Sequence, residues 1–154
     1  MAHFAELESK TDPTGFTSDT HLVVKRVVVV GNDIEVNGGT LADNDMHADG
    51  EKWCRDFFGS ETIWKQTSYN HNFRKQYAGI EMVYDESKNK FLSPQPFTSW
   101  ALNSNDDWKA PVTYPAGDQS NYYISWDEDN LRWVAVDLSG DNFNWDASKL
   151  EWVS

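Results

Sequence analysis

Apolar residues along this chain mostly follow the patterns of β-strands. The strongest segment is His21–Val30, HLVVKRVVVV, whose β-branched residues predict a strand. Its continuous apolar run is typical of a strand that is buried on both faces. Shorter strands are predicted at Phe4–Leu7, Thr62–Tyr69 and Ala78–Tyr84, and the polar, turn-rich segment Thr11–Thr20 is predicted to be a loop.

One segment, Gly50–Phe58, has the periodicity of a helix. Its apolar residues fall at positions i, i+1, i+4 and i+5, which form one helical face: Trp53, Cys54, Phe57 and Phe58. Asp49 is expected to cap the first turn, and Gly59 to end the helix in a left-handed conformation. Because so short a helix is marginal by itself, we expect its apolar face to pack on a sheet.

The second half of the chain repeats a short aromatic pattern. An aromatic ring is followed by a polar turn segment and a second ring seven or eight residues later, in Tyr84–Phe91, Trp100–Trp108, Trp126–Trp133 and Trp145–Trp152. In three of the four, Asp directly follows the first ring, and Asp favours turns because its side chain bonds nearby backbone amides. Each unit is therefore predicted to be a β-hairpin with its two rings paired across the ladder.

These elements predict a mainly β (α+β) fold. We expect a small antiparallel sheet domain with one short helix over residues 1–115, followed by a Trp-rich β-hairpin subdomain over residues 116–154. Ala116–Asn121 is the expected linker. Four prolines exclude central strands from the stretch before it: Pro94, Pro96, Pro111 and Pro115.

Charge and composition narrow the function classes. The 154 residues contain 13 Lys and Arg against 25 Asp and Glu, so the net charge is −12. This charge argues against nucleic acid and against an anionic membrane surface as partners. No apolar run approaches the length of a membrane span, and the opening MAHFAELESK lacks the basic and apolar segments of a signal peptide.

Residues that would carry chemistry are scarce, and we predict no catalytic, cofactor-binding or metal-binding residue and no enzymatic activity. The single cysteine, Cys54, is expected to be a buried structural thiol. The string Asp45, His47, Asp49, Gly50 and Asp56 matches the spacing of a calcium loop but has unsuitable ligands at two positions. Paired acids such as those in Asp127–Asp129 suit a glycosidase only across a cleft, and we expect them in solvated hairpin turns.

One basic, aromatic segment stands out in this acidic chain. Thr62–Ile80 contains no acid and carries +3, so the remainder carries −15. Such a segment suits an interface with an acidic surface of another subunit, or a local balance to acidic neighbours within the fold. The candidate interface residues are Trp64, Lys65, Tyr69, Phe73, Arg74, Lys75 and Tyr77.

The same segment carries a family resemblance. WKQTSYNHNFRKQYAGI, followed by YDESKNKF and PQPFTSW, resembles a family of small virion structural proteins of marine tailed phages, including cyanophages. MAHFAEL, CRDFFG, WKAPVTYP and YISWDEDNLRWVAV are similar to that family as well, so the resemblance covers most of the chain. Ser9–His21 and Leu41–Asp49 look longer than in the family. The resemblance implies a virion component without enzymatic activity, and it transfers no site residues.

The leading functional prediction is a non-enzymatic virion protein exposed on the particle, as a capsid decoration or as an accessory of the tail or its fibres. Its expected partners are major capsid, tail or fibre subunits, with an oligomeric state in the particle. Docking is expected through the basic segment or by strand addition to an exposed edge of His21–Val30.

The alternative is a carbohydrate- or host-receptor-binding module, with a host glycan as partner. Exposed Trp rings would stack on sugar faces, whereas packed rings would only stabilise the hairpins. The candidate sugar-binding residues are Trp100, Trp108, Trp126, Trp133, Trp145 and Trp152.

Overall fold

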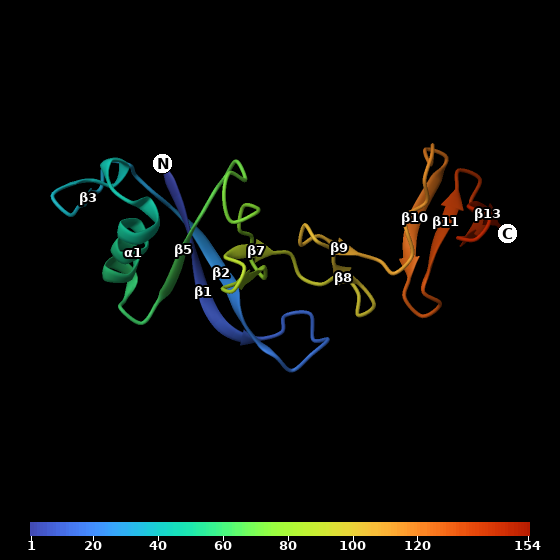
Figure 1. Cartoon of the computed structure of the whole chain (residues 1–154), viewed down its shortest axis with the longest axis horizontal. Helices are drawn as coiled ribbons and strands as arrows, with labels where there is room; N and C mark the ends of the chain where they lie inside the picture. Colours follow the sequence, from blue (N-terminus) through green and yellow to red (C-terminus); the bar gives the residue numbers. More distant parts are fainter. The chain divides into compact units, whose positions relative to one another are not determined.

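The computed structural model describes all of residues 1–154 and divides them into two compact units, an N-terminal unit (1–94) and a C-terminal unit (95–154). The elements of each can be followed in Figure 1, and antiparallel strands predominate in both, so the mainly β prediction is confirmed. The division lies at Pro94, not at the predicted boundary after residue 115. The reason is packing, because Trp100 and Val112 lie against the tryptophan core of the C-terminal unit.

The N-terminal unit is built on a five-stranded antiparallel sheet with the order β5-β1-β2-β6-β7. The strands are β1 (Ala2–Thr11), β2 (Thr20–Val30), β5 (Ile63–Thr67), β6 (Val83–Asp85) and β7 (Lys90–Leu92). A small hairpin, β3 (Glu35–Val36) and β4 (Gly39–Thr40), follows β2. The predicted strand at Ala78–Tyr84 is wrong for most of its length, because Glu81 adopts a positive φ of 71° in a turn before β6.

The long hairpin of β1 and β2 is the centre of this sheet. Its ladder runs from Ala2 opposite Val30 to Thr11 opposite Thr20, with one register shift between Glu6 and Leu7. The predicted strand at His21–Val30 is therefore confirmed, and the first strand extends well beyond Phe4–Leu7. Burial of β2 on both faces is wrong, because Val29 is 54% exposed.

The helical segment begins earlier than its periodicity suggests. A 3₁₀ turn, η1 (Leu41–Asp43), and a π-helical turn, η2 (Met46–Gly50), lead into α1 (Glu51–Phe58). The cap is Asp45, whose carboxylate accepts hydrogen bonds from the amides of His47 and Ala48. The expected cap at Asp49 is wrong, because the π turn moves the start of the helical segment forward. Gly59 ends α1 with φ 135° and ψ 137°, which is not the predicted left-handed conformation.

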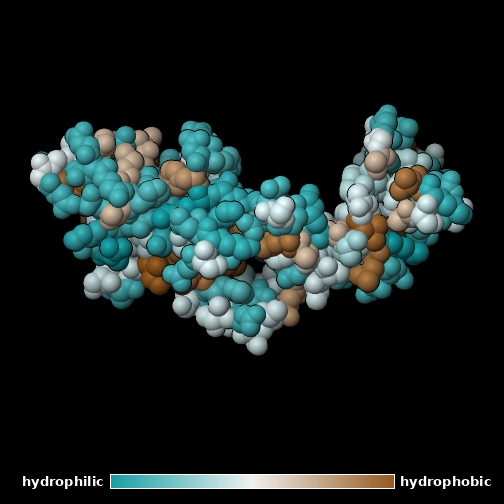
Figure 2. Space-filling model, in the orientation of Figure 1, coloured by the Kyte–Doolittle hydropathy of each residue, from teal (hydrophilic) through white to brown (hydrophobic).

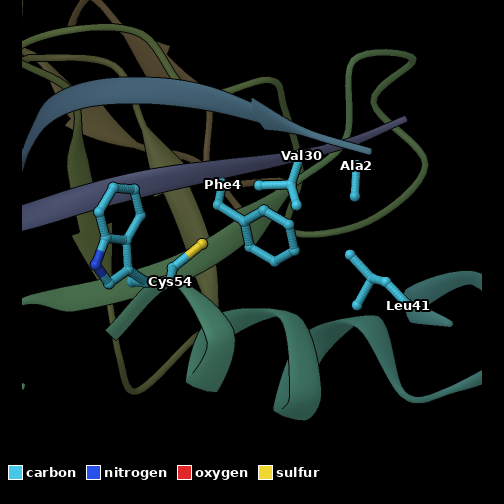
Figure 3. Close-up of a cluster of buried hydrophobic side chains, with 6 residues drawn as sticks. Ala2, Phe4, Val30, Leu41 and Cys54 are labelled. Atoms are coloured by element: carbon cyan, nitrogen blue, oxygen red, sulfur yellow. The ribbon is translucent and has the colours of Figure 1, made fainter. Parts of the chain in front are cut away.

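The helical segment packs against one face of the sheet and forms a hydrophobic core with it (Figure 3). The buried members of this core are Ala2, Phe4, Val30, Leu41, Cys54 and Trp64. Gly50 lets the helix come this close, because a Cβ there would lie 2.3 Å from Cζ of Phe4. The opposite face of the sheet has its own cluster, formed by Ala5, Leu7, Val24, Ala78, Tyr84 and Phe91.

The C-terminal unit contains a short hairpin and a four-stranded antiparallel meander. The hairpin joins β8 (Ala101–Leu102) and β9 (Trp108–Lys109), and the meander has the order β10-β11-β12-β13. The meander strands are β10 (Tyr122–Asp127), β11 (Arg132–Asp137), β12 (Asn142–Asp146) and β13 (Glu151–Val153). Three tryptophans form its core: Trp126, Trp133 and Trp145.

The aromatic hairpins pair as predicted in three of the four repeats. The paired rings are Tyr84 with Phe91, Trp126 with Trp133, and Trp145 with Trp152. In the fourth repeat, Trp108 lies opposite Leu102 instead of Trp100. In the three paired hairpins, the residue four positions after the turn Asp has positive φ: Asn89 at 52°, Leu131 at 51° and Leu150 at 58°.

Candidate docking surface

The outer edge of β5 is closed by side chains. The backbone amide of Gln66 donates to Oε1 of Glu51 at 2.8 Å, and Nη1 of Arg74 donates to the carbonyl oxygen of Gln66 at 2.8 Å. The same Nη1 of Arg74 lies 2.8 Å from Oε1 of Glu51, and both side chains are about nine-tenths buried. Since an unpaired strand edge invites pairing with another chain, this ion pair protects β5 from such contacts.

The outer edge of β2 is closed only along its first half. β6 pairs with β2 through Leu22 and Val23, and Val24 exchanges backbone hydrogen bonds with the turn before β6. Beyond that point, Lys25–Val30 has β1 as its only strand neighbour. We call this segment the open β2 edge.

Aromatic side chains gather around the start of β1, the strand next to the open β2 edge. His3 stacks on Tyr69 with ring centroids 5.7 Å apart, and Tyr77 meets both rings edge-on, at 5.5 Å from His3 and 5.4 Å from Tyr69. Val29 lies opposite His3 in the ladder, so the four side chains form one surface, here called the aromatic patch. Tyr69 is 65% exposed. The open edge and the patch together are the candidate docking surface of the N-terminal unit.

The N-terminal unit has other exposed apolar side chains as well, namely Met1, Phe16, Phe57, Ile63 and Ile80. Its face in Figure 2 is mostly hydrophilic with small, separate apolar spots. Scattered apolar residues of this kind are normal on a protein surface, whereas Val29 lies on an unpaired strand edge, where another chain can pair.

The structure separates the seven predicted interface residues into two groups. Tyr69 and Tyr77 belong to the aromatic patch. The others serve the fold: Trp64 is buried in the core, Arg74 pairs with Glu51, Phe73 packs edge-on against His47, Lys65 lies over the ring of Tyr84, and Lys75 is half-buried. For Arg74, the observed role is the alternative considered above, a local balance to an acidic neighbour.

Two members of the site, His3 and Val29, were not among the predicted residues. The signal available in the sequence was β-strand alternation, which places His3 and Ala5 on one face and Ala2 and Phe4 on the other. That alternation does not show which face is left uncovered, because the covering segments come from distant parts of the chain.

His47 is an unusual group close to the sealed β5 edge. Its Nδ1 is buried without a hydrogen-bond partner, and its ring packs on Phe73 with centroids 4.7 Å apart. Burial and then the charge of Arg74 lower the pKa of His47. The imidazole is therefore held in its neutral form, which suits a position beside a guanidinium.

The six predicted sugar-binding tryptophans are largely used inside the C-terminal unit. Trp126, Trp133 and Trp145 are buried, and Trp100, Trp108 and Trp152 are half-buried. The rings of Trp126 and Trp133 meet at 5.0 Å, and those of Trp145 and Trp152 at 5.1 Å. A ring packed in this way has little face left for a sugar.

Three of the six indole N–H groups donate hydrogen bonds, whereas that of Trp100 is buried without a partner. Trp126 donates to Oε2 of Glu128 at 2.7 Å, Trp133 to the carbonyl oxygen of Val112 at 2.9 Å, and Trp152 to Oε1 of Gln119 at 2.8 Å. Glu128 also accepts from the amide and hydroxyl of Ser99, and these hydrogen bonds lower the pKa of Glu128. This carboxylate ties a hairpin turn to the preceding chain, a role that the sequence did not predict.

The remaining chemical groups act within the fold. The Cys54 thiol is buried, and this burial, with the nearby charge of Glu51, raises the pKa of the thiol to about 12. Asp45 caps η2, and Asp49 accepts from the side chain of Asn37 and the amide of Asp45. The structure contains no group of three His, Cys, Asp or Glu side chains suited to a metal ion.

The paired acids of the hairpins lie in turns, as the sequence predicts. Hydrogen bonds from Ser87, Asn130 and Ser148 are the main cause of a lowered pKa in Asp85, Asp127 and Asp146, respectively. A catalytic general acid needs the opposite shift of its pKa.

None of the helices has the length and apolar character to cross a membrane. No protein-family model, no curated protein and no solved structure matches the chain.

Proposed function

We propose that this chain is a non-enzymatic structural protein of a phage virion, exposed on the particle and held there by contacts with other virion subunits. The virion setting rests on the sequence resemblance described above. The structural role rests on one observation: β5 is sealed by the Glu51–Arg74 pair, whereas the open β2 edge lies unpaired beside the aromatic patch. A protein that needed no partner would gain from closing both edges.

The acidic groups support the same proposal. The hairpin aspartates are occupied by hydrogen bonds in their own turns, and their pKa values lie below the usual range. Such carboxyls are ionised at neutral pH and are poorly suited to donate a proton. They serve turn formation and give the particle surface negative charge.

The alternative of a carbohydrate- or receptor-binding module has weaker support. Three of its six candidate rings belong to the core of the C-terminal unit, where they pack on one another. Fluorescence tests this reading: packed rings give blue-shifted tryptophan emission that is poorly quenched and does not respond to sugars. Red-shifted emission that changes on adding a glycan would favour the alternative.

The test of the main proposal is quantitative mass spectrometry of purified particles of the phage that encodes the chain. A copy number close to that of the major capsid protein would indicate capsid decoration. Far fewer copies would place the chain on the tail or its fibres. Absence from the particle would overturn the proposal.

A further inference from the structure

The direction of the backbone groups on the open β2 edge follows from the sealed edge on the other side of the hairpin. In antiparallel strands, the N–H and C=O of one residue point to the same side, and successive residues alternate. Both groups of Gln66 bind the sealing ion pair, so they point away from β1. Phe4, opposite Gln66, therefore points its groups to Val28 of β2. The neighbours Val27 and Val29 then point theirs outward.

The bonds further down β2 agree with this direction. Val24 lies opposite Leu7, an odd number of residues from Phe4, and its amide and carbonyl bond outward to Met82 and Glu81. The structure gives no hydrogen-bond partner to the outward groups of Val27 and Val29. Two amides and two carbonyls are thus presented in one row, spaced as an added strand would need them.

We propose that the open β2 edge pairs antiparallel with the same edge of a second copy of this chain. With a two-fold axis at Val28, Val27 lies opposite Val29 of the second copy, and Val29 lies opposite its Val27. This one register pairs all four outward backbone groups in each copy, which is the self-complementarity that a two-fold interface requires.

Side chains favour the same register. β-branched residues opposite one another stabilise a ladder, and the exposed Val29 would be covered. Arg26 lies opposite Val30 of the second copy, so like charges do not face one another directly. The partner strand also passes beside Val29, the member of the aromatic patch that lies on β2.

The size of this contact predicts a weak association. Two six-residue edges bury less than the roughly 1,200 Å² of a stable interface. Each copy also carries a net charge of −12, and this repulsion is screened by salt. We therefore expect a monomer–dimer equilibrium that strengthens with protein concentration and with ionic strength. The inference deepens the proposed function, because copies crowded on a particle would pair most readily.

Analytical ultracentrifugation of the purified full chain tests this pairing. The variant Val29→Pro removes the outward amide while leaving the ladder with β1 intact, since proline is tolerated at an edge. It removes two of the four intermolecular bonds, so the dissociation constant should rise at least about tenfold. Val29→Lys, which keeps the amide and places a charge on the edge, should also weaken the dimer and serves if the proline variant does not fold.

The matched control is Leu138→Ser, which removes an exposed apolar side chain of the C-terminal unit and should leave the dimer unchanged. Amide hydrogen exchange gives a second readout: protection of Val27 and Val29 should increase with protein concentration, while Val28 stays protected throughout. A chain that remains monomeric, or a dimer unaffected by either Val29 variant, would overturn the inference. The proposed function is tested separately, by the copy number of the chain on the particle, and that number does not depend on whether the chain dimerises.

Discussion

The close approach of the helix to the sheet at Gly50 leads to a quantitative prediction. Gly50 has a helical backbone, φ −70° and ψ −41°, so alanine fits its conformation and gains about 1 kcal/mol of helix propensity. However, a Cβ would lie 2.3 and 2.7 Å from two ring carbons of Phe4 and 3.2 Å from Cδ1 of Leu41. Carbon atoms normally keep about 3.5–4.0 Å.

The overlap at Gly50 cannot be relieved cheaply, because Phe4 and Leu41 are both fully buried. Overpacking of this kind costs about 1–3 kcal/mol, and an overlap of more than an ångström lies at the upper end. After the helix gain is subtracted, we expect Gly50→Ala to lower the free energy of unfolding by about 1–2 kcal/mol.

Urea unfolding followed by circular dichroism measures this loss. The exposed helix position Lys52 supplies the control, because Lys52→Ala changes helix propensity and an exposed ion pair with Asp56 without touching the core. A shorter side chain in Phe4→Leu should make Gly50→Ala less costly, and a double-mutant cycle gives the coupling between the two sites. If Gly50→Ala proves as stable as the native chain, or more so, the reasoning about close approach is refuted.

Three further predictions concern an ion pair, a turn and a loop. Arg74→Met should lower the free energy of unfolding in urea by about 3–5 kcal/mol, because the buried Glu51 carboxylate loses its counter-charge. A loss below about 1 kcal/mol would contradict the role of this ion pair in closing the edge of β5. Leu150→Gly should raise the free energy of unfolding by about 1 kcal/mol, because Leu150 has φ 58°, whereas Leu138→Gly, at an exposed leucine without positive φ, should not stabilise. Hydrogen bonds, mainly from Thr14, lower the pKa of Asp12 from 3.8 to about 2. The contribution of the Asp12 carboxylate to folding stability is therefore present above pH 4 and is lost as the pH falls towards 2. The stability difference between the native chain and Asp12→Ala should therefore shrink over that range in acid titrations, and a constant difference would exclude this role.

Local sequence determined the hairpins of this protein. An Asp after an aromatic residue bonds amides two or three residues onward, and those contacts need no distant partner. For the same reason, the β-branched run His21–Val30 and the helix around Cys54 could be identified from the sequence, although Phe57, which was expected to pack on the sheet, is 67% exposed. The aromatic rings of Trp126 and Trp133 then pair because the turn length sets the register between them.

Only the tertiary structure decided which edges are closed and which residues are exposed. β5 pairs with β1 across some sixty residues of chain, and Arg74 reaches Glu51 across 23. Neither pairing leaves a local pattern, since distant segments meet only when the whole sheet and helix pack together. The same packing buries Trp64 and Arg74 and leaves Val29 exposed next to His3. It also places the boundary between the two units at Pro94. The sequence thus indicated a basic, aromatic segment, and the fold left Tyr69 and Tyr77 of that segment in the aromatic patch and left one edge of β2 unpaired.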